Sequence, residues 1–306
     1  MPARESEAFV LRTYPYREAD LVVSFVARDR GKLRGIARGA RRPKSRFGSG
    51  LERLAHARLF YFQRDSQELV KLDCCELMGP PLFLRADYTT SLALDYIAEV
   101  CEQLLPDHEP NDAFFRLLRL IASELWEGLS GDFQSNRAAL GPELVATTPH
   151  EAVNGSRLTR GNIAPEKAGA ASAKASQAFQ DEGLEAVGWL WRSLTYFSLW
   201  AVRLGGWLPP LHVCIQSGAE LRADETAYFE RSQPGLFSAE YRTPDSWPMA
   251  SASRAIAAEM LRKPLDQLEP RRWSRKTAED LRRFLVQRLE TQFERRLKTA
   301  VELAQL

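Results

Sequence analysis

The sequence predicts an α+β protein of several domains, with a small five-stranded barrel at the N-terminus and a helical domain after it. Three observations predict this fold class. Five short segments rich in β-branched and aromatic residues fill residues 1–80, helical periodicity begins at Asp87, and residues 187–204 are apolar on nearly every face. A length of 306 residues suits two or three domains.

The barrel prediction rests on the number and spacing of the short segments. The predicted strands are 7–14, 20–27, 32–37, 54–63 and 68–75. Turns with Gly31 and with residues 64–67 separate neighbouring strands. Because closure removes exposed sheet edges, five short strands favour a barrel of the OB-fold type over residues 1–80. Gly79, Pro80 and Pro81 then mark a domain boundary.

The rest of the chain is predicted to be mainly helical. One helix begins near Asp87 and ends before Pro106, and a second begins after Asn111 as N-cap. The apolar helix over 187–204 is expected at the centre of the core. The last helix is expected to have Thr277 as N-cap and a packing face every four residues, formed by Leu281, Leu285, Leu289, Phe293, Leu297 and Val301.

These patterns predict the domain boundaries. The first part of the helical domain is expected at 81–130 and 183–208, with a disordered insertion at 131–182, where large apolar residues are scarce. A loop-rich module is expected at 209–243. The C-terminal helices of the helical domain are expected at 244–306.

A run of cations between Arg30 and Gly50 is the main functional signal. It contains eight Lys or Arg residues and no Asp or Glu. Phosphates of a nucleic acid would supply the complementary charge, and an aromatic ring could stack on bases. A solvated charged loop is the alternative. The predicted DNA-binding residues are Arg30, Lys32, Arg34, Arg38, Arg41, Arg42, Lys44, Arg46 and Phe47.

Two segments resemble the N-terminal signature of the RecO recombination mediators: Ala8–Leu21 and Arg30–Gly48, of which the basic run from Gly39 to Gly48 is the most specific. Weaker similarity continues in Tyr96–Leu118 and Leu199–Gly218. The resemblance covers most of the chain except the predicted insertion.

The resemblance implies a role in DNA repair and recombination. A protein of this kind binds single- and double-stranded DNA, anneals complementary strands, and acts with RecR to load RecA onto DNA coated by single-strand-binding protein (SSB). Some members also act with RecF, and family members dock the acidic-hydrophobic C-terminal tail of SSB on the helical domain. The implied location is cytoplasmic and nucleoid-associated, without a membrane partner.

Many RecO-like proteins carry a four-cysteine zinc module, and this chain departs from that pattern. The matching positions hold Cys214, Ser217, Ser238 and Tyr241. One thiol and hydroxyl groups do not make the thiolate set that structural zinc prefers. We therefore predict a degenerate, cysteine-poor zinc-ribbon-like module without metal, held by apolar packing of residues such as Phe229, Leu236 and Phe237.

No catalytic or cofactor motif is recognised, so we predict a protein that is not an enzyme and has no cofactor. The eight acids of 95–127 are expected on a solvated helix face rather than in a nuclease site. Two rivals remain: an RNA-binding OB-fold protein of translation or ribosome assembly, and a DNA-processing nuclease. A second basic stretch, 271–298, either extends the DNA-binding surface or forms the solvated outer face of the last helix.

Overall fold

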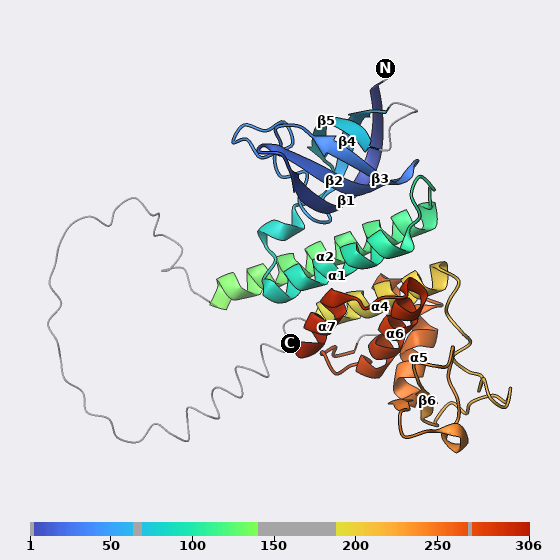
Figure 1. Ribbon diagram of the computed structural model, residues 1–306. Coiled ribbons are helices and arrows are strands. Elements are labelled where there is room, and N and C mark those ends of the chain that lie inside the picture. The colour runs from blue at the N-terminus through green and yellow to red at the C-terminus, as the bar shows by residue number, and fades with distance from the viewer. Residues whose placement is uncertain (1–2, 64–68, 140–187, 269–270) are drawn as a thin grey trace, which may run out of the picture.

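The computed structural model describes residues 3–63, 69–139, 188–268 and 271–306. Three layers follow one another in Figure 1. The N-terminal barrel lies at one end, the helices α1 and α2 cross beneath it, and the remaining helices pack on the opposite side of that pair. The loop-rich segment that contains β6 (Ala227–Phe229) extends from the far end, next to α5 (Ser251–Met260).

Five strands close into the predicted barrel in the order β1-β2-β3-β5-β4, with β4 returning to β1. All neighbours are antiparallel except β3 and β5, which are parallel. The strands are β1 (Ala3–Tyr16), β2 (Asp20–Ala27), β3 (Gly31–Ala37), β4 (His56–Phe62) and β5 (Leu69–Leu77). The barrel prediction is confirmed, with β1 longer at both ends than expected.

Alternating side chains fill the barrel. Val10, Phe25, Leu59 and Tyr61 are buried inside it, and Ser6 shares a buried hydrogen bond of 3.0 Å with the Tyr61 hydroxyl. A bulge at Leu11 interrupts the pairing of β1 with β2. Because the pleat has a period of two, this extra residue exchanges the inward and outward positions on the rest of β1.

The first two helices begin as the sequence predicts. The Asp87 side chain accepts a hydrogen bond of 2.7 Å from the Thr90 N–H at the start of α1 (Tyr88–Leu104). The Asn111 side chain accepts one of 2.9 Å from the Phe114 N–H at the start of α2 (Asp112–Ala139). Both side chains thereby satisfy backbone donors that the first helical turn leaves free.

Helix α2 corrects the predicted boundary of the insertion. It continues to Ala139, so residues 131–139 are helical rather than disordered. Because this stretch lacks proline, and because adding a residue to an existing helix costs little, the helix propagates past the last core residues. The rest of the predicted insertion, from 140 to 182, lies outside the described residues.

The apolar helix α4 (Gly188–Leu204) occupies the centre of the helical core. It packs on α1, α2 and α6, and Phe197 lies edge-on to both Tyr96 and Phe114. Trp191 and Tyr196 are buried, which confirms their assignment to the core. Among the helices that the structure describes, none has the length and apolar character needed to span a bilayer.

The C-terminal helical prediction is partly wrong. The expected single helix is divided into α6 (Glu279–Phe293) and α7 (Lys298–Gln305), and Glu294 between them adopts a left-handed conformation. The residue before α6 is Ala278, also left-handed, so Thr277 is not the N-cap. After the break Val301 is exposed, whereas Leu297 remains buried.

Helix α7 is anchored by a buried acid from α1. The Glu99 carboxylate accepts hydrogen bonds from the backbone N–H groups of Lys298 and Thr299, at 3.3 and 3.1 Å. It also accepts one of 2.6 Å from the Thr299 hydroxyl. Free N–H groups and the helix dipole both favour an anion here, which explains a carboxylate in the core. Glu99 therefore does not belong to a solvated face.

The remaining elements are short. β6 (Ala227–Phe229) and β7 (Trp247–Met249) form a two-stranded sheet, and α5 (Ser251–Met260) packs against α6. Three 3₁₀ turns, η1 (Leu82–Leu84), η3 (Ala239–Tyr241) and η4 (Leu265–Gln267), complete the described secondary structure.

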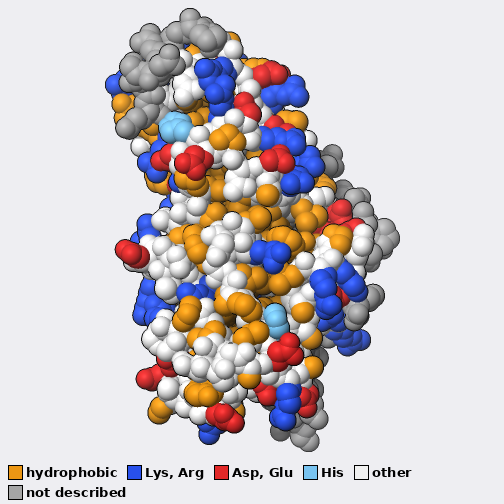
Figure 2. Space-filling view, turned by 90° about the vertical axis from the view of Figure 1, so that its right-hand side faces the viewer, with side chains coloured by type: hydrophobic (Ala, Val, Ile, Leu, Met, Phe, Trp, Pro, Cys, Tyr) orange, Lys and Arg blue, Asp and Glu red, His pale blue; other side chains and the backbone are white. Residues whose placement is uncertain are grey.

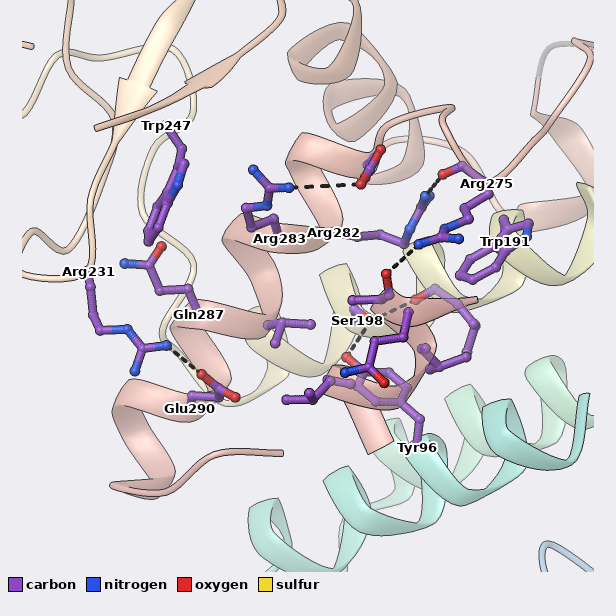
Figure 3. A pocket seen from close by; sticks show the side chains of 18 residues that line it. Tyr96, Trp191, Ser198, Arg231, Trp247, Arg275, Arg282, Arg283, Gln287 and Glu290 are labelled. Carbon is purple, nitrogen blue, oxygen red and sulfur yellow. Dashed lines mark hydrogen bonds and ion pairs between the residues drawn. The ribbon is translucent and has the colours of Figure 1, made fainter. Parts of the chain in front are cut away.

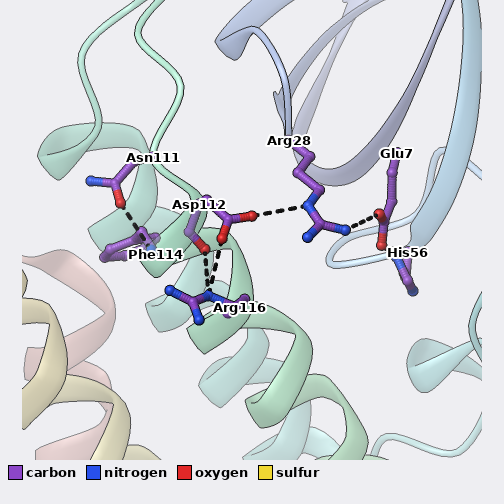
Figure 4. Close-up of polar contacts among 7 residues, drawn as sticks. All are labelled: Glu7, Arg28, His56, Asn111, Asp112, Phe114 and Arg116. Carbon is purple, nitrogen blue, oxygen red and sulfur yellow. Dashed lines mark hydrogen bonds and ion pairs between the residues drawn. The ribbon is translucent and has the colours of Figure 1, made fainter.

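The barrel is fixed to α2 by apolar contacts and by the charged contacts that Figure 4 shows. Phe9 of β1 lies 5.2 Å from Phe115 and stacks on His56 at 4.6 Å. Beside these rings, the Arg28 guanidinium contacts Asp112 at 3.0 Å and Glu7 at 3.2 Å. His56 lies 2.9 Å from the other Glu7 oxygen. This polar cluster joins two strands to the first turn of α2.

The Glu7 carboxylate should make stability depend on pH in the acid range. Burial opposes its ionisation, but hydrogen bonds from His56 and Arg28 outweigh burial and hold the pKa of Glu7 below its ordinary value of 4.5. The folded state therefore binds fewer protons than the unfolded state here, and the stabilisation is lost as the pH falls below about 4.5. We expect Glu7→Gln to flatten the fall of urea midpoints between pH 5 and 3. A slope identical to that of the unaltered protein would contradict this role.

Candidate nucleic-acid interface

The loop that carries most of the predicted cations is tied to the β1–β2 turn and to β5. The Gly39 N–H donates to the Asp20 carboxylate at 2.8 Å, and the Arg41 N–H donates to the Ala19 carbonyl at 3.1 Å. At the other end, the Cys75 thiol donates to the Phe47 carbonyl at 3.0 Å. A side chain at Gly50 would collide with the Cys75 sulfur. The loop thus has a defined place on the barrel.

Four of the eight predicted cations have acidic neighbours. Lys32 is buried, and its ammonium contacts the Glu102 carbonyl at 2.8 Å and Asp107 at 3.3 Å. This position corrects the prediction for Lys32, because its charge is directed to the helical domain rather than to solvent. The other pairs are Arg30 with Asp29 at 3.6 Å, Arg34 with Glu102 at 4.0 Å and Arg46 with Asp73 at 2.8 Å.

These three arginine pairs differ from the Lys32 contact because the arginines are exposed. Exposed ion pairs contribute about 0–1 kcal/mol, so a phosphate can replace the acid at little cost. Arg30, Arg34 and Arg46 consequently have guanidinium groups that an anionic ligand can reach. Glu102, the partner of Arg34, is only 8% exposed, so breaking that pair costs more than breaking the other two.

The other four cations, Arg38, Arg41, Arg42 and Lys44, are exposed and have no ion pair with any described acid. Only Arg41 has a side-chain hydrogen bond in this part of the chain, a long one of 3.4 Å to the Glu18 carbonyl. Four positive charges therefore gather within seven residues without local compensation, which favours binding of a polyanion.

Phe47 corrects the prediction of a stacking ring. Its side chain is only 3% exposed and packs in the barrel core with Leu51 and Leu59. The loop folds back at Gly48 and Gly50, which places the ring inside. A base cannot reach it in this conformation.

Two tyrosines that the sequence analysis did not assign to the site lie beside the loop: Tyr14, at the end of a predicted strand, and Tyr16, just beyond it. Tyr14 and Tyr16 are 41% and 38% exposed. Arg17, which follows them, places its guanidinium 5.3 Å from the Tyr16 ring centre. The alternation of the two tyrosines with Thr13 and Pro15 could have shown that both rings lie on one face of the strand. The bulge at Leu11 then decides which face that is.

Comparisons with known proteins agree with this architecture. The family models described as "Recombination protein O N terminal" and "Recombination protein O C terminal" match residues 1–81 and 182–300. DNA repair protein RecO of Koribacter versatilis is 37% identical over 303 residues, which are 99% of each chain. The chain belongs to the RecO family. Its role is therefore in DNA repair and recombination.

Other RecO proteins match a smaller part. DNA repair protein RecO of Cutibacterium acnes is 38% identical over 130 residues, 42% of this chain and 52% of its own. The RecO protein of Syntrophus aciditrophicus is 31% identical over 124 residues, 40% of this chain and 48% of its own.

The positions that match the zinc module of RecO-like proteins lie near one another. Cys214 is buried, its sulfur is 4.0 Å from the Ser238 hydroxyl, and the Tyr241 N–H donates to the Ser238 carbonyl at 3.1 Å. One thiol beside hydroxyls does not fit zinc. No cluster of three or more His, Cys, Asp or Glu side chains suited to a metal occurs in the described ranges. Phe229, Leu236 and Phe237 are buried, which confirms the predicted apolar packing.

Cys214 should carry a thiolate near neutral pH. Burial raises its pKa, but hydrogen bonds from the Ser217 hydroxyl and from backbone N–H groups of Gln216, Ser217 and Ser238 lower it to about 7. Burial raises the pKa of Cys74 and Cys101, and raises that of Cys75 to about 11. We expect thiolate absorbance at 240 nm to titrate near pH 7, and Cys214→Ser to abolish that step. A step that persists in this variant would contradict the assignment.

The second basic stretch, 271–298, is not a continuous cationic surface. Arg282 and Arg288 are directed into the fold, where Arg282 donates to the Thr195 hydroxyl at 3.0 Å and Arg288 to the Gln233 carbonyl at 2.8 Å. Burial lowers the pKa of Arg282 to about 10.

On the face drawn in Figure 2, Lys and Arg alternate with Asp and Glu over the barrel, and hydrophobic side chains gather over the middle.

Proposed function

We propose that this RecO family member is a non-enzymatic mediator that binds single- and double-stranded DNA on its barrel and anneals complementary strands. The observation that carries the proposal is the group of four exposed, uncompensated cations Arg38, Arg41, Arg42 and Lys44. Arg30, Arg34 and Arg46 extend the surface. Neutralised phosphates no longer repel a second strand, so two complementary strands can approach without any bond being made or broken.

Replacement of Arg38, Arg41, Arg42 and Lys44 together by alanine should weaken binding to an oligo(dT) strand and flatten its salt dependence. Each lost phosphate contact removes about 0.7 from the slope of log K against log salt, so the slope should fall by up to about 3. The control variant replaces four exposed arginines outside the barrel, Arg119, Arg203, Arg242 and Arg262. It removes the same charge and should retain the slope.

Equal slopes for the loop variant and the unaltered protein would contradict the proposal. Annealing of complementary strands coated with SSB should fall in parallel with binding. A structured RNA competing better than single-stranded DNA would favour an RNA-binding function instead.

The proposed partners follow from the family. With RecR, and in some pathways RecF, the protein helps RecA replace SSB on single-stranded DNA. Binding of the loop to the phosphates explains how the protein could hold a strand during that exchange. Its location would then be the cytoplasm, at the nucleoid.

A pocket in the helical domain supports docking of the SSB tail (Figure 3). The cavity measures about 630 Å³ and lies between α4, α6 and α7, with Trp191, Leu194 and Val286 on its apolar wall. Arg231, Arg275, Arg282 and Arg283 line it against only Glu279 and Glu290. Within the described structure, the Gln287 amide and the Trp191 indole N–H are buried without partners. An acidic tail with an apolar end complements these features.

Reversal of one charge at the rim of this pocket should weaken binding of the SSB tail. Arg283 is half exposed and lies 3.9 Å from Glu279, so Arg283→Glu alters the pocket without opening the core. We expect about fivefold weaker binding of a fluorescent peptide with the SSB tail sequence, because an attraction becomes a repulsion. Arg262→Glu, in the turn that follows α5, is the matched control, because Arg262 is exposed and does not line the pocket. Equal affinities for both variants would rule out this pocket.

A further inference from the structure

Strand register aligns apolar side chains on the outer face of the barrel. Tyr14 of β1 pairs with Val22 of β2, and Val22 pairs with Ile36 of β3. Paired residues point to the same face, and the alternate position, Val23, lies inside the barrel. Tyr14, Val22 and Ile36 therefore form one outward row. Tyr16, two residues along β1, occupies the next row with Asp20.

The described part of the helical domain leaves this row accessible to solvent. Phe9 and Leu11, earlier on β1, pack in the core shared with the helices, whereas Tyr14 and Tyr16 are exposed and Val22 and Ile36 are half-buried. Exposed tyrosines in a row with aliphatic side chains make a flat apolar strip. Such strips on the strands of OB-folds suit nucleotide bases.

Cations border the strip. Asp20, the partner of Tyr16, accepts the hydrogen bond from Gly39 that starts the basic loop, so Arg38 lies next to this row. The Arg41 N–H and guanidinium contact the carbonyls of Ala19 and Glu18, in the turn after Tyr16. Positive charges thus stand at the edge of the aromatic strip.

We propose that Tyr14 and Tyr16 stack on unpaired bases of a single strand whose phosphates contact Arg38 and Arg41. The two residues lie about 6.8 Å apart along the strand, twice the spacing of stacked bases, so each ring can take a separate base. A duplex keeps its bases inside and gains only the phosphate contacts. The strip would therefore make the barrel bind a single strand more tightly than a duplex. This inference rests on the proposed function, because it requires a strand on the loop.

The test compares three ligands of equal length: oligo(dT), an abasic strand and a duplex. Replacement of both Tyr14 and Tyr16 by alanine should weaken oligo(dT) binding at least about thirtyfold, because the variant loses two base stacks. Affinities for the abasic strand and the duplex should not change. The Tyr14→Phe, Tyr16→Phe double variant keeps the rings and should bind as the unaltered protein does. Tyr88→Ala, which removes a 69% exposed ring from α1, is the control.

Equal oligo(dT) affinity of the double alanine variant, or equal weakening for all three ligands, would overturn the stacking role. A second measurement needs no substitution: 5-iodouracil in the strand should crosslink to Tyr14 or Tyr16, and crosslinks confined to other residues would overturn the role as well. The four-cation loop variant separates the two proposals. If that variant loses binding while the tyrosine variant does not, only the stacking role fails.

Discussion

The contact of Lys32 with the helical domain fixes the barrel in place and turns one of the predicted cations away from solvent. Its ammonium is held by the Glu102 carbonyl and by Asp107, and the nearby Arg28 is held by Asp112 and Glu7. Asp107, in the loop between α1 and α2, and Asp112, in the first turn of α2, are thereby used at the junction. On the loop beyond β3, Arg38, Arg41, Arg42 and Lys44 have no ion pair with a described acid, and all four are exposed. Lys32 and Arg28 therefore have acidic partners at the junction between the barrel and the helices, whereas the four cations without such partners lie on the loop.

Much of this architecture could be predicted from local patterns. The five strands and their turns follow from alternation and glycine placement, and Asp87 and Asn111 mark helix starts because capping is a local interaction. The all-round apolar character of α4 correctly predicted a central helix. The cations of 38–44 were found for the same reason, since an uninterrupted run of one charge is visible without knowledge of the fold.

The remaining features depend on contacts between distant residues. Phe47 resembled a stacking residue, but the loop returns its ring to the core. Lys32 belongs to the same basic run, yet its partners lie some seventy residues away. The break between α6 and α7 has no proline or glycine to mark it: Glu294 is left-handed, and the backbone after it is held by the side chains of Glu290 and Glu99. The outward position of Tyr14 depends on a single extra residue in β1.

The capping of α7 by Glu99 joins residues 200 positions apart in the chain. During synthesis the barrel can close as soon as residue 77 has left the ribosome, because all its strands lie before that point. The helical core has to wait until residues 298 and 299 have been synthesised. Until then the apolar faces of α1, α2 and α4 are incomplete, which makes the nascent helical domain the part most in need of chaperone protection.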